Sequence, residues 1–283
     1  MRGVDVACAA GYAIVVAAVS AGDAMDPLEA LRQEREQTLA SFRDPHQSPL
    51  AAVARHDFAG NRPMSFGSAE DSDVRLEGVE ARAAVVRALP DGFELQSEGR
   101  TEKLPPGAKV QLGRYTLRFS HQNFPGVVVL DAQSPRLSAG PFPVWFEPDA
   151  RFRIEARLVP DAPQREEIVL STRGNQRRAL RLGKLQFTLQ GKPMQLTALR
   201  LLEPGAGEAA VSVFFRDATT GHESYEVGRY VDALPLGEDR YLLDFNRAYN
   251  PTCAFSPLYN CPIPPRENVL PLAIRAGERA PPL

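Results

Sequence analysis

The sequence has few of the side chains that most often bind metals or act as nucleophiles. Its 283 residues include only 3 cysteines and 4 histidines, and no two histidines have the i, i+4 spacing of a zinc site. No G-x-S-x-G segment is present, which argues against a serine-hydrolase nucleophile elbow. Walker-type loops and strand-linked G-x-G-x-x-G motifs are also missing. The sequence therefore predicts neither a metal site nor a cofactor, heme and flavin included.

An excess of charge of one sign is missing as well. The net charge is -2 and the isoelectric point is near 6.1, so nothing calls for nucleic acid or an anionic membrane as a partner. Apolar and charged contents of 43% and 24% are typical of a globular protein. The 25 prolines, many at the borders of apolar runs, favour short strands and fixed loops over long helices.

An uncharged run from Val6 to Ala21 follows Arg2. It is shorter than the roughly twenty residues of a membrane span but suits the core of a signal peptide. Small residues at Val19-Ser20-Ala21 fit a cleavage site. We therefore expect residues 1–21 to be a signal peptide, and the mature chain to be periplasmic or secreted without a stable membrane span. The alternative is an uncleaved N-terminal anchor or a misplaced start.

Cleavage of the signal peptide would remove Cys8 and leave Cys253 and Cys261. An even pair of cysteines, close in sequence and in an oxidising compartment, predicts a disulfide. The spacing excludes a C-x-x-C redox motif, and without a neighbouring histidine the pair makes a poor zinc site. We interpret it as a structural disulfide that closes a C-terminal loop.

The pattern of apolar residues predicts an all-β protein with one N-terminal helix. Asp26-Pro27 is typical of a helix start, and residues 22–60 are expected to hold this helix and a linker. From Phe66 the period changes to two, and short alternating segments indicate sandwich-like or barrel-like lobes. A proline-rich stretch separates an N-terminal β lobe, 61–148, from a C-terminal β lobe, 149–283, which includes the disulfide-closed loop. The basic run 173–184 is interpreted as the solvated face of a strand and its loop.

Asp, Asn, Arg and Tyr crowd two segments of the C-terminal lobe, 215–230 and 244–268. Such side chains both satisfy loop backbone and bind ligands. If a ligand binds, we expect it on the surface formed by Asp217, Arg229, Tyr230, Asp244, Asn246, Arg247 and Tyr249.

The same segments resemble the signature of a large bacterial family, the domain of unknown function numbered sixteen eighty-four. Its hallmark is D-x-T-x-G, then Y-x-x-G-R, then DFNRAYNP-x-C and CP-x-PP-x-EN. The sequence carries every element of this pattern: Asp217, Thr219 and Gly221; Tyr225, Gly228 and Arg229; 244–251 with Cys253; Cys261, Pro262, Pro264, Pro265, Glu267 and Asn268. That family has no settled activity, so the resemblance implies membership and no reaction.

A second resemblance concerns residues 65–76. This segment is similar to the opening strands of a forkhead-associated domain, a β-sandwich that binds phosphothreonine. Ser68 stands where that family has an arginine, and no Ser-x-x-His follows. The resemblance therefore implies a sandwich for the first lobe without phosphopeptide binding.

Two functions fit these observations. The first is a non-catalytic binding or envelope-assembly module, in which Arg229 and Arg247 pair with Asp217, Asp244 or Glu267 and fix the geometry of the loops. The second is a hydrolase that acts on a cell-envelope carbohydrate or other envelope molecule, with Asp217 and Asp244 as paired acid and base. The partner would be an unknown small molecule or envelope component. An open pocket lined by unpaired charges would favour the hydrolase, and a closed network the module.

Overall fold

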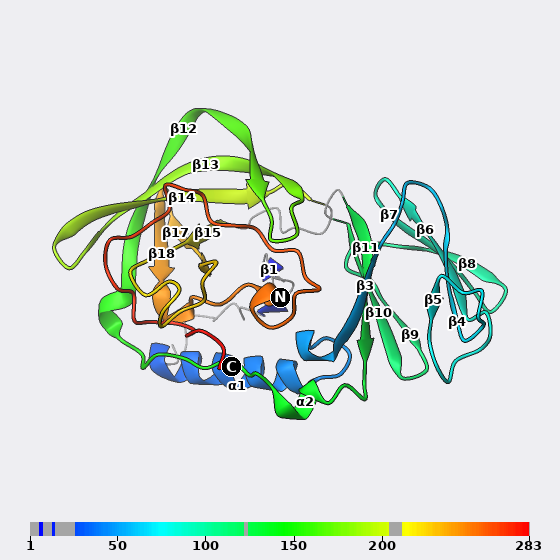
Figure 1. The fold of residues 1–283 in the computed structure, drawn as a ribbon. Coiled ribbons are helices and arrows are strands. Elements are labelled where there is room, and N and C mark those ends of the chain that lie inside the picture. The colour runs from blue at the N-terminus through cyan, green and yellow to red at the C-terminus, as the bar shows by residue number, and fades with distance from the viewer. Residues whose placement is uncertain (1–5, 8–12, 15–25, 122–123, 204–210, 283) are drawn as a thin grey trace. The chain divides into compact units, whose positions relative to one another are not determined.

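The computed structural model describes residues 6–7, 13–14, 26–121, 124–203 and 211–282. These residues are mostly β with an N-terminal helix, which confirms the predicted fold class (Figure 1). Contacts divide the chain into two compact units. We call Ser41–Gly140 the sandwich unit; the curved-sheet unit contains Pro141–Leu202, the chain from residue 211 onward and helical residues 27–40. None of the described helices is long and apolar enough to cross a membrane.

Helix α1 spans Pro27–Arg43. Asp26 begins it as predicted, because its side chain accepts a hydrogen bond from Leu28 N at 3.4 Å. Pro27 suits the first helical position, where the backbone N–H that proline lacks would have no partner within the helix. Before the helix, β1 (Val6–Ala7) pairs antiparallel with β2 (Ala13–Ile14). The rest of the expected signal peptide lies outside the described residues.

The sandwich unit consists of two sheets. Their strand orders are β3-β11-β10-β9 and β5-β4-β6-β7-β8, with β4 and β5 parallel and the other neighbours antiparallel. Phe66 and Phe93 from the second sheet meet Leu117 and Phe119 from the first in one buried core. The elements are η1 (Pro49–Ala51), β3 (Ala52–Asp57), β4 (Met64–Gly67), β5 (Val74–Arg75), β6 (Ala84–Leu89), β7 (Gly92–Ser97), β8 (Arg100–Leu104), β9 (Lys109–Leu112), β10 (Tyr115–His121), β11 (Pro125–Asp131) and α2 (Arg136–Ala139). The closer resemblance to a forkhead-associated domain stays a prediction.

The curved-sheet unit is built on seven strands in the order β16-β15-β14-β13-β12-β18-β17, all antiparallel. Its longest strands, β12 and β13, form the arch visible in Figure 1. The register shifts between Arg181 and Gly183, where a Cβ on the glycine would lie 2.2 Å from Val159 O. The elements are η2 (Ala150–Phe152), β12 (Arg153–Leu170), β13 (Gln176–Leu189), β14 (Lys192–Leu201), β15 (Ser212–Phe215), β16 (Arg229–Asp232), β17 (Leu234–Gly237), β18 (Arg240–Asp244), η3 (Phe245–Arg247) and η4 (Thr252–Ala254).

Side chains alternate between two buried clusters on these strands, as the period of two in a strand requires. Val213 and Phe215 of β15 belong to the larger cluster, whereas Phe214 between them belongs to the smaller one with Tyr230. The C-terminal segment supplies Leu270 and Ile274 to the larger cluster. Strand β15 is therefore buried on both of its faces, and the C-terminal segment covers one of them.

One predicted strand is shorter than expected. The sequence of residues 225–231 predicts a strand over the whole segment, but β16 begins only at Arg229. Gly228 has φ +116, and a Cβ there would lie 2.5 Å from Phe215 O. The residues before it form turns that carry Asp217 back toward β16.

Candidate functional site

Asp217 and Arg229 form an ion pair that is closed to solvent. Arg229 Nη2 donates to Asp217 Oδ2 at 2.7 Å, and the exposed fractions of the two side chains are 1% and 0%. The other carboxylate oxygen of Asp217 accepts hydrogen bonds from Thr219 N at 2.7 Å and from Thr219 Oγ1 at 2.5 Å. Both oxygens of Asp217 are thus occupied by groups of the protein.

The guanidinium of Arg229 also binds the backbone of the C-terminal segment. Nη2 donates to Ile274 O at 2.8 Å, and Nη1 donates to Ala276 O at 2.5 Å and Glu278 O at 2.9 Å. The ring of Phe215 lies 5.4 Å from the guanidinium carbon. Burial lowers the pKa of Arg229, and attraction to Asp217 opposes that shift. One cation therefore joins a turn to the backbone of the C-terminal segment.

Glu278 is a buried carboxylate beside this pair. Asn250 N donates to its Oε2 at 2.9 Å, and Asn250 Nδ2 donates to Arg279 O at 2.7 Å. Burial raises the pKa of Glu278 to about 7, although Arg229 and Arg35 both lower it. The sequence reasoning missed this residue, because Glu278 lies beyond the signature and no local pattern indicates its burial.

Asp244 and Asn246 close the start of η3. Asp244 Oδ1 accepts from Asn246 N at 3.0 Å and from Asn246 Nδ2 at 3.0 Å. Asn246 also pairs with the backbone of Asp149, accepting from its N at 2.8 Å and donating to its O at 2.9 Å. These contacts fix a strand end and leave Asp244 serving as a cap.

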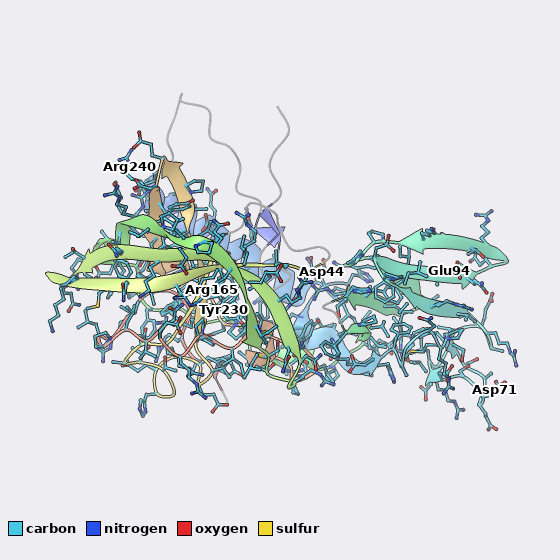
Figure 2. All side chains as sticks on the ribbon, turned by 90° about the horizontal axis from the view of Figure 1, so that it is seen from above. Asp44, Asp71, Glu94, Arg165, Tyr230 and Arg240 are labelled. Carbon is cyan, nitrogen blue, oxygen red and sulfur yellow. The ribbon has the colours of Figure 1, made fainter. Side chains whose placement is uncertain are left out.

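Arg247 and the two tyrosines are placed separately. Arg247 Nη2 donates to Glu34 Oε1 of α1 at 2.8 Å. Tyr230 and Tyr249 pair through both backbone hydrogen bonds and pack at 84° with ring centroids 5.7 Å apart. The Tyr230 hydroxyl donates to Pro262 O, and that of Tyr249 donates to Asp232 Oδ2 at 3.2 Å. Figure 2 shows Tyr230 inside the curved-sheet unit, with Arg240 at its periphery.

The candidate residues thus form separate local pairs with other groups of the described chain. A hollow in the described part of this unit is lined by residues 146–151 and Arg275, which include none of them. Asp217 is enclosed and Asp244 is a cap, so their contacts do not support the paired acid and base of a glycosidase. Of these pairs, that of Asp217 and Arg229 is closed to solvent.

The predicted disulfide is absent, because the structure holds Cys253 and Cys261 as free thiols. The cysteines are nevertheless adjacent, since Cys253 N donates to Cys261 Sγ at 3.3 Å. Proximity was predictable from the short spacing. The oxidation state is not encoded in the sequence.

The interpretation of the basic run 173–184 as a solvated face is wrong for two of its residues. Arg177 and Arg181 are buried, with 2% and 7% of their surface exposed. Arg181 contacts three carboxylates, those of Asp161 at 2.7 Å, Glu167 at 3.2 Å and Glu267 at 2.7 Å. Glu267 belongs to the C-terminal signature, so this pairing could not be seen within the strand alone.

Asn268, next to Glu267 in the signature, also joins the C-terminal segment to the sheet. Its Oδ1 accepts from Thr197 N at 2.7 Å, and its Nδ2 donates to Thr197 O and Phe214 O at 2.9 Å each. This side chain therefore pairs with the backbone of both β14 and β15. The described residues contain no group of three or more His, Cys, Asp or Glu arranged to hold a metal ion.

Comparison with known proteins gives a family and no activity. The model of the family described as Protein of unknown function (DUF1684) matches residues 144–279. The solution NMR structure of the uncharacterized protein from gene locus rrnAC0354 of Haloarcula marismortui is 36% identical, covers 49% of this chain and 76% of its own, and has a TM-score of 0.41. None of the curated proteins matches.

Proposed function

The chain belongs to the DUF1684 family of proteins of unknown function, and from this premise we propose that it is a non-catalytic binding or assembly module of the cell envelope. The observation that carries the proposal is the closed ion pair of Asp217 and Arg229. A catalytic carboxylate must reach its substrate, whereas these side chains reach only other parts of the protein. Their role in this proposal is to hold the loops in place.

The stability cost of breaking an ion pair depends on whether the pair is buried. Removing one partner of a buried pair leaves an uncompensated charge and costs about 3–5 kcal/mol. An exposed pair such as Arg240 with Glu155, at 3.4 Å and with side chains 53% and 55% exposed, contributes at most about 1 kcal/mol. In this proposal the buried pair of Asp217 and Arg229 therefore stabilises the fold, and a partner would bind to the outer surface of the protein.

The proposed location outside the cytoplasm rests on the N-terminal sequence. An uncharged run over residues 6–21 and small residues near Ala21 are typical of a cleaved leader. Fractionation of the producing cells, with the mass of the purified N-terminal peptide, tests this part. A full-length chain in the cytosolic fraction would contradict it.

The test of the module itself compares folding with function. We expect Asp217→Asn to lower the free energy of unfolding by about 3–5 kcal/mol, because it leaves the charge of Arg229 unpaired. Arg229→Lys should also lower it, because an ammonium group cannot reproduce the hydrogen bonds that the guanidinium makes to Asp217 and three carbonyl groups. Each variant should restore the phenotype of a deletion strain in proportion to the amount of folded protein that it yields. Denaturant unfolding and complementation at matched expression give the two quantities.

Glu155→Gln and Arg240→Lys are the matched controls, because they change an exposed pair by the same chemical steps. They should unfold within about 1 kcal/mol of the wild type and complement fully. A buried-pair variant that is folded like the wild type but fails to complement would overturn the non-catalytic proposal. Accumulation of an envelope compound in that strain would point to the hydrolase.

A further inference from the structure

The two thiols differ in their access to solvent. Cys261 is buried, with 4% of its surface exposed, and its backbone is held by Thr172, which accepts from Cys261 N at 3.1 Å and donates its own N–H to Cys261 O at 2.9 Å. Cys253 lies in η4 and is partly exposed. A reagent from solution would therefore meet Cys253 first.

The surroundings of Cys253 favour its thiolate. Tyr225 donates its hydroxyl to Cys253 Sγ at 3.8 Å, and Cys253 N donates to the neighbouring Cys261 Sγ at 3.3 Å. The hydrogen bond from Cys261 is the largest of several that lower the pKa of Cys253, whereas burial raises the pKa of Cys261 well above its usual range. The Cys253 sulfur therefore ionises more readily to the nucleophilic thiolate, whereas the Cys261 sulfur keeps its proton.

A structural disulfide would need none of these donors. Sulfur atoms in a disulfide are weak acceptors, but a thiolate gains much from hydroxyl and thiol donors. The arrangement has the parts of a thiol–disulfide exchange centre, namely an accessible attacking thiol and a buried thiol beside it.

We propose that Cys253 and Cys261 form a redox-active dithiol whose substrate is a low-molecular-weight disulfide. The Cys253 thiolate attacks one sulfur of the substrate, the substrate S–S bond breaks, and the first small thiolate leaves. Cys261 then loses its proton and attacks Cys253 Sγ, which releases the second small thiol and forms the Cys253–Cys261 bond. The protein dithiol loses two electrons and two protons, and the substrate disulfide becomes two thiols.

This activity is additional to the proposed module and does not depend on it. The probe is oxidised glutathione, added to the reduced full-length chain. All variants carry Cys8→Ser, so that only the two thiols of interest report. Intact mass after acid quenching and alkylation counts free thiols and adducts over time.

We expect the protein with both thiols to lose them together, with no lasting adduct. Cys261→Ser should accumulate one glutathionyl group on Cys253, since nothing resolves the mixed disulfide. Cys253→Ser should form an adduct at least about tenfold more slowly, because Cys261 is buried. Excess reduced glutathione should restore both thiols in the folded protein.

Tyr225→Phe in the Cys261→Ser chain tests the thiolate itself. Loss of the hydroxyl should move the pH at which Cys253 alkylation is half-maximal upward, with unchanged thermal unfolding. Tyr241→Phe is the control, because it removes the hydroxyl of another half-buried tyrosine and should leave that pH unchanged.

Three results would overturn the proposal. They are equal adduct rates for the two single-cysteine chains, no thiol loss with oxidised glutathione, and a bond that reduced glutathione opens only after denaturation. The last result would identify a structural disulfide.

Discussion

Glu278 is the side chain whose ionisation most directly affects stability near neutral pH. Its carboxylate is buried, it accepts one hydrogen bond from Asn250 N, and two guanidinium groups, those of Arg229 and Arg35, act on it from other segments. Burial nevertheless prevails and raises the pKa from 4.5 to about 7. The folded protein thus holds a proton on Glu278 more tightly than the unfolded chain does.

From this pKa we predict that stability falls as pH rises. The contribution of protonated Glu278 is fully present below about pH 4.5, the unfolded pKa, and is lost as pH rises through about 7. A shift of this size corresponds to about 3 kcal/mol. Glu278→Gln keeps a neutral acceptor, so it should match the wild type in acid and unfold with up to about 3 kcal/mol more free energy near pH 8.

Urea unfolding at a series of pH values measures this difference. Glu226→Gln is the control, since it removes an exposed carboxylate from the same unit. Its pH curve should follow that of the wild type. A constant difference between Glu278→Gln and the wild type across the pH range would mean that Glu278 stays ionised in the folded protein.

At the scale of elements, the last segment of the curved-sheet unit has no strand partners of its own along most of its length. Its carbonyl groups must still be satisfied when buried. Arg229 accounts for Ile274 O, Ala276 O and Glu278 O. A side chain on β16 therefore does for this segment what a neighbouring strand would otherwise do.

Close packing of this segment makes Gly277 a sensitive position. Gly277 has φ +75, and a Cβ there would lie 2.4 Å from Ala248 O and 2.7 Å from Phe245 O. We expect Gly277→Ala to lower the free energy of unfolding by about 2–4 kcal/mol. The steric clash of the new Cβ with these two carbonyl oxygens adds to the cost of a left-handed backbone at a residue other than glycine. Thermal and denaturant unfolding measure the loss.

Gly191→Ala is the matched control. Gly191 has φ +73 with no atom within 4 Å of the added Cβ, so only the conformational cost of about 1 kcal/mol should appear. Equal losses for the two variants would show that the close approach to the η3 carbonyls carries no energy.

At the scale of the whole molecule, each unit has a hydrophobic core of its own. Phe93 is fully buried in the sandwich unit, with Phe119 at a ring distance of 4.9 Å. Phe187 is buried in the curved-sheet unit, at 6.0 Å from Phe245. Truncation of a buried phenylalanine to alanine costs about 3–5 kcal/mol.

We predict that each truncation destabilises its own unit. Hydrogen exchange with peptide-level mass spectrometry should show Phe93→Ala raising exchange in 52–131 while 153–201 keeps its protection. Phe187→Ala should give the reverse, which makes each variant the control for the other. If both variants raised exchange equally in both regions, the units would open as one cooperative body.

The secondary structure and the family could be predicted from the sequence, because both depend on residues that are close together along the chain. Asp26-Pro27 starts the helix, a period of two marks most strands, and residues 144–279 match the model of the predicted family. These features are local, because capping and alternation depend on residues only a few positions apart. Sequence reasoning therefore reached the fold class and the family.

The sequence offered Asp217 among three partners for Arg229, but only the tertiary structure decided which charges are buried and which groups replace their water. Arg229 finds Asp217 12 positions before it and carbonyl groups 45 to 49 positions after it. The local sequence predicts a solvated Arg181, but the fold pairs this side chain with Glu267, which lies 86 positions later. The free energy of a charge depends on the groups that replace its water, and chain order does not specify those groups when they come from distant segments.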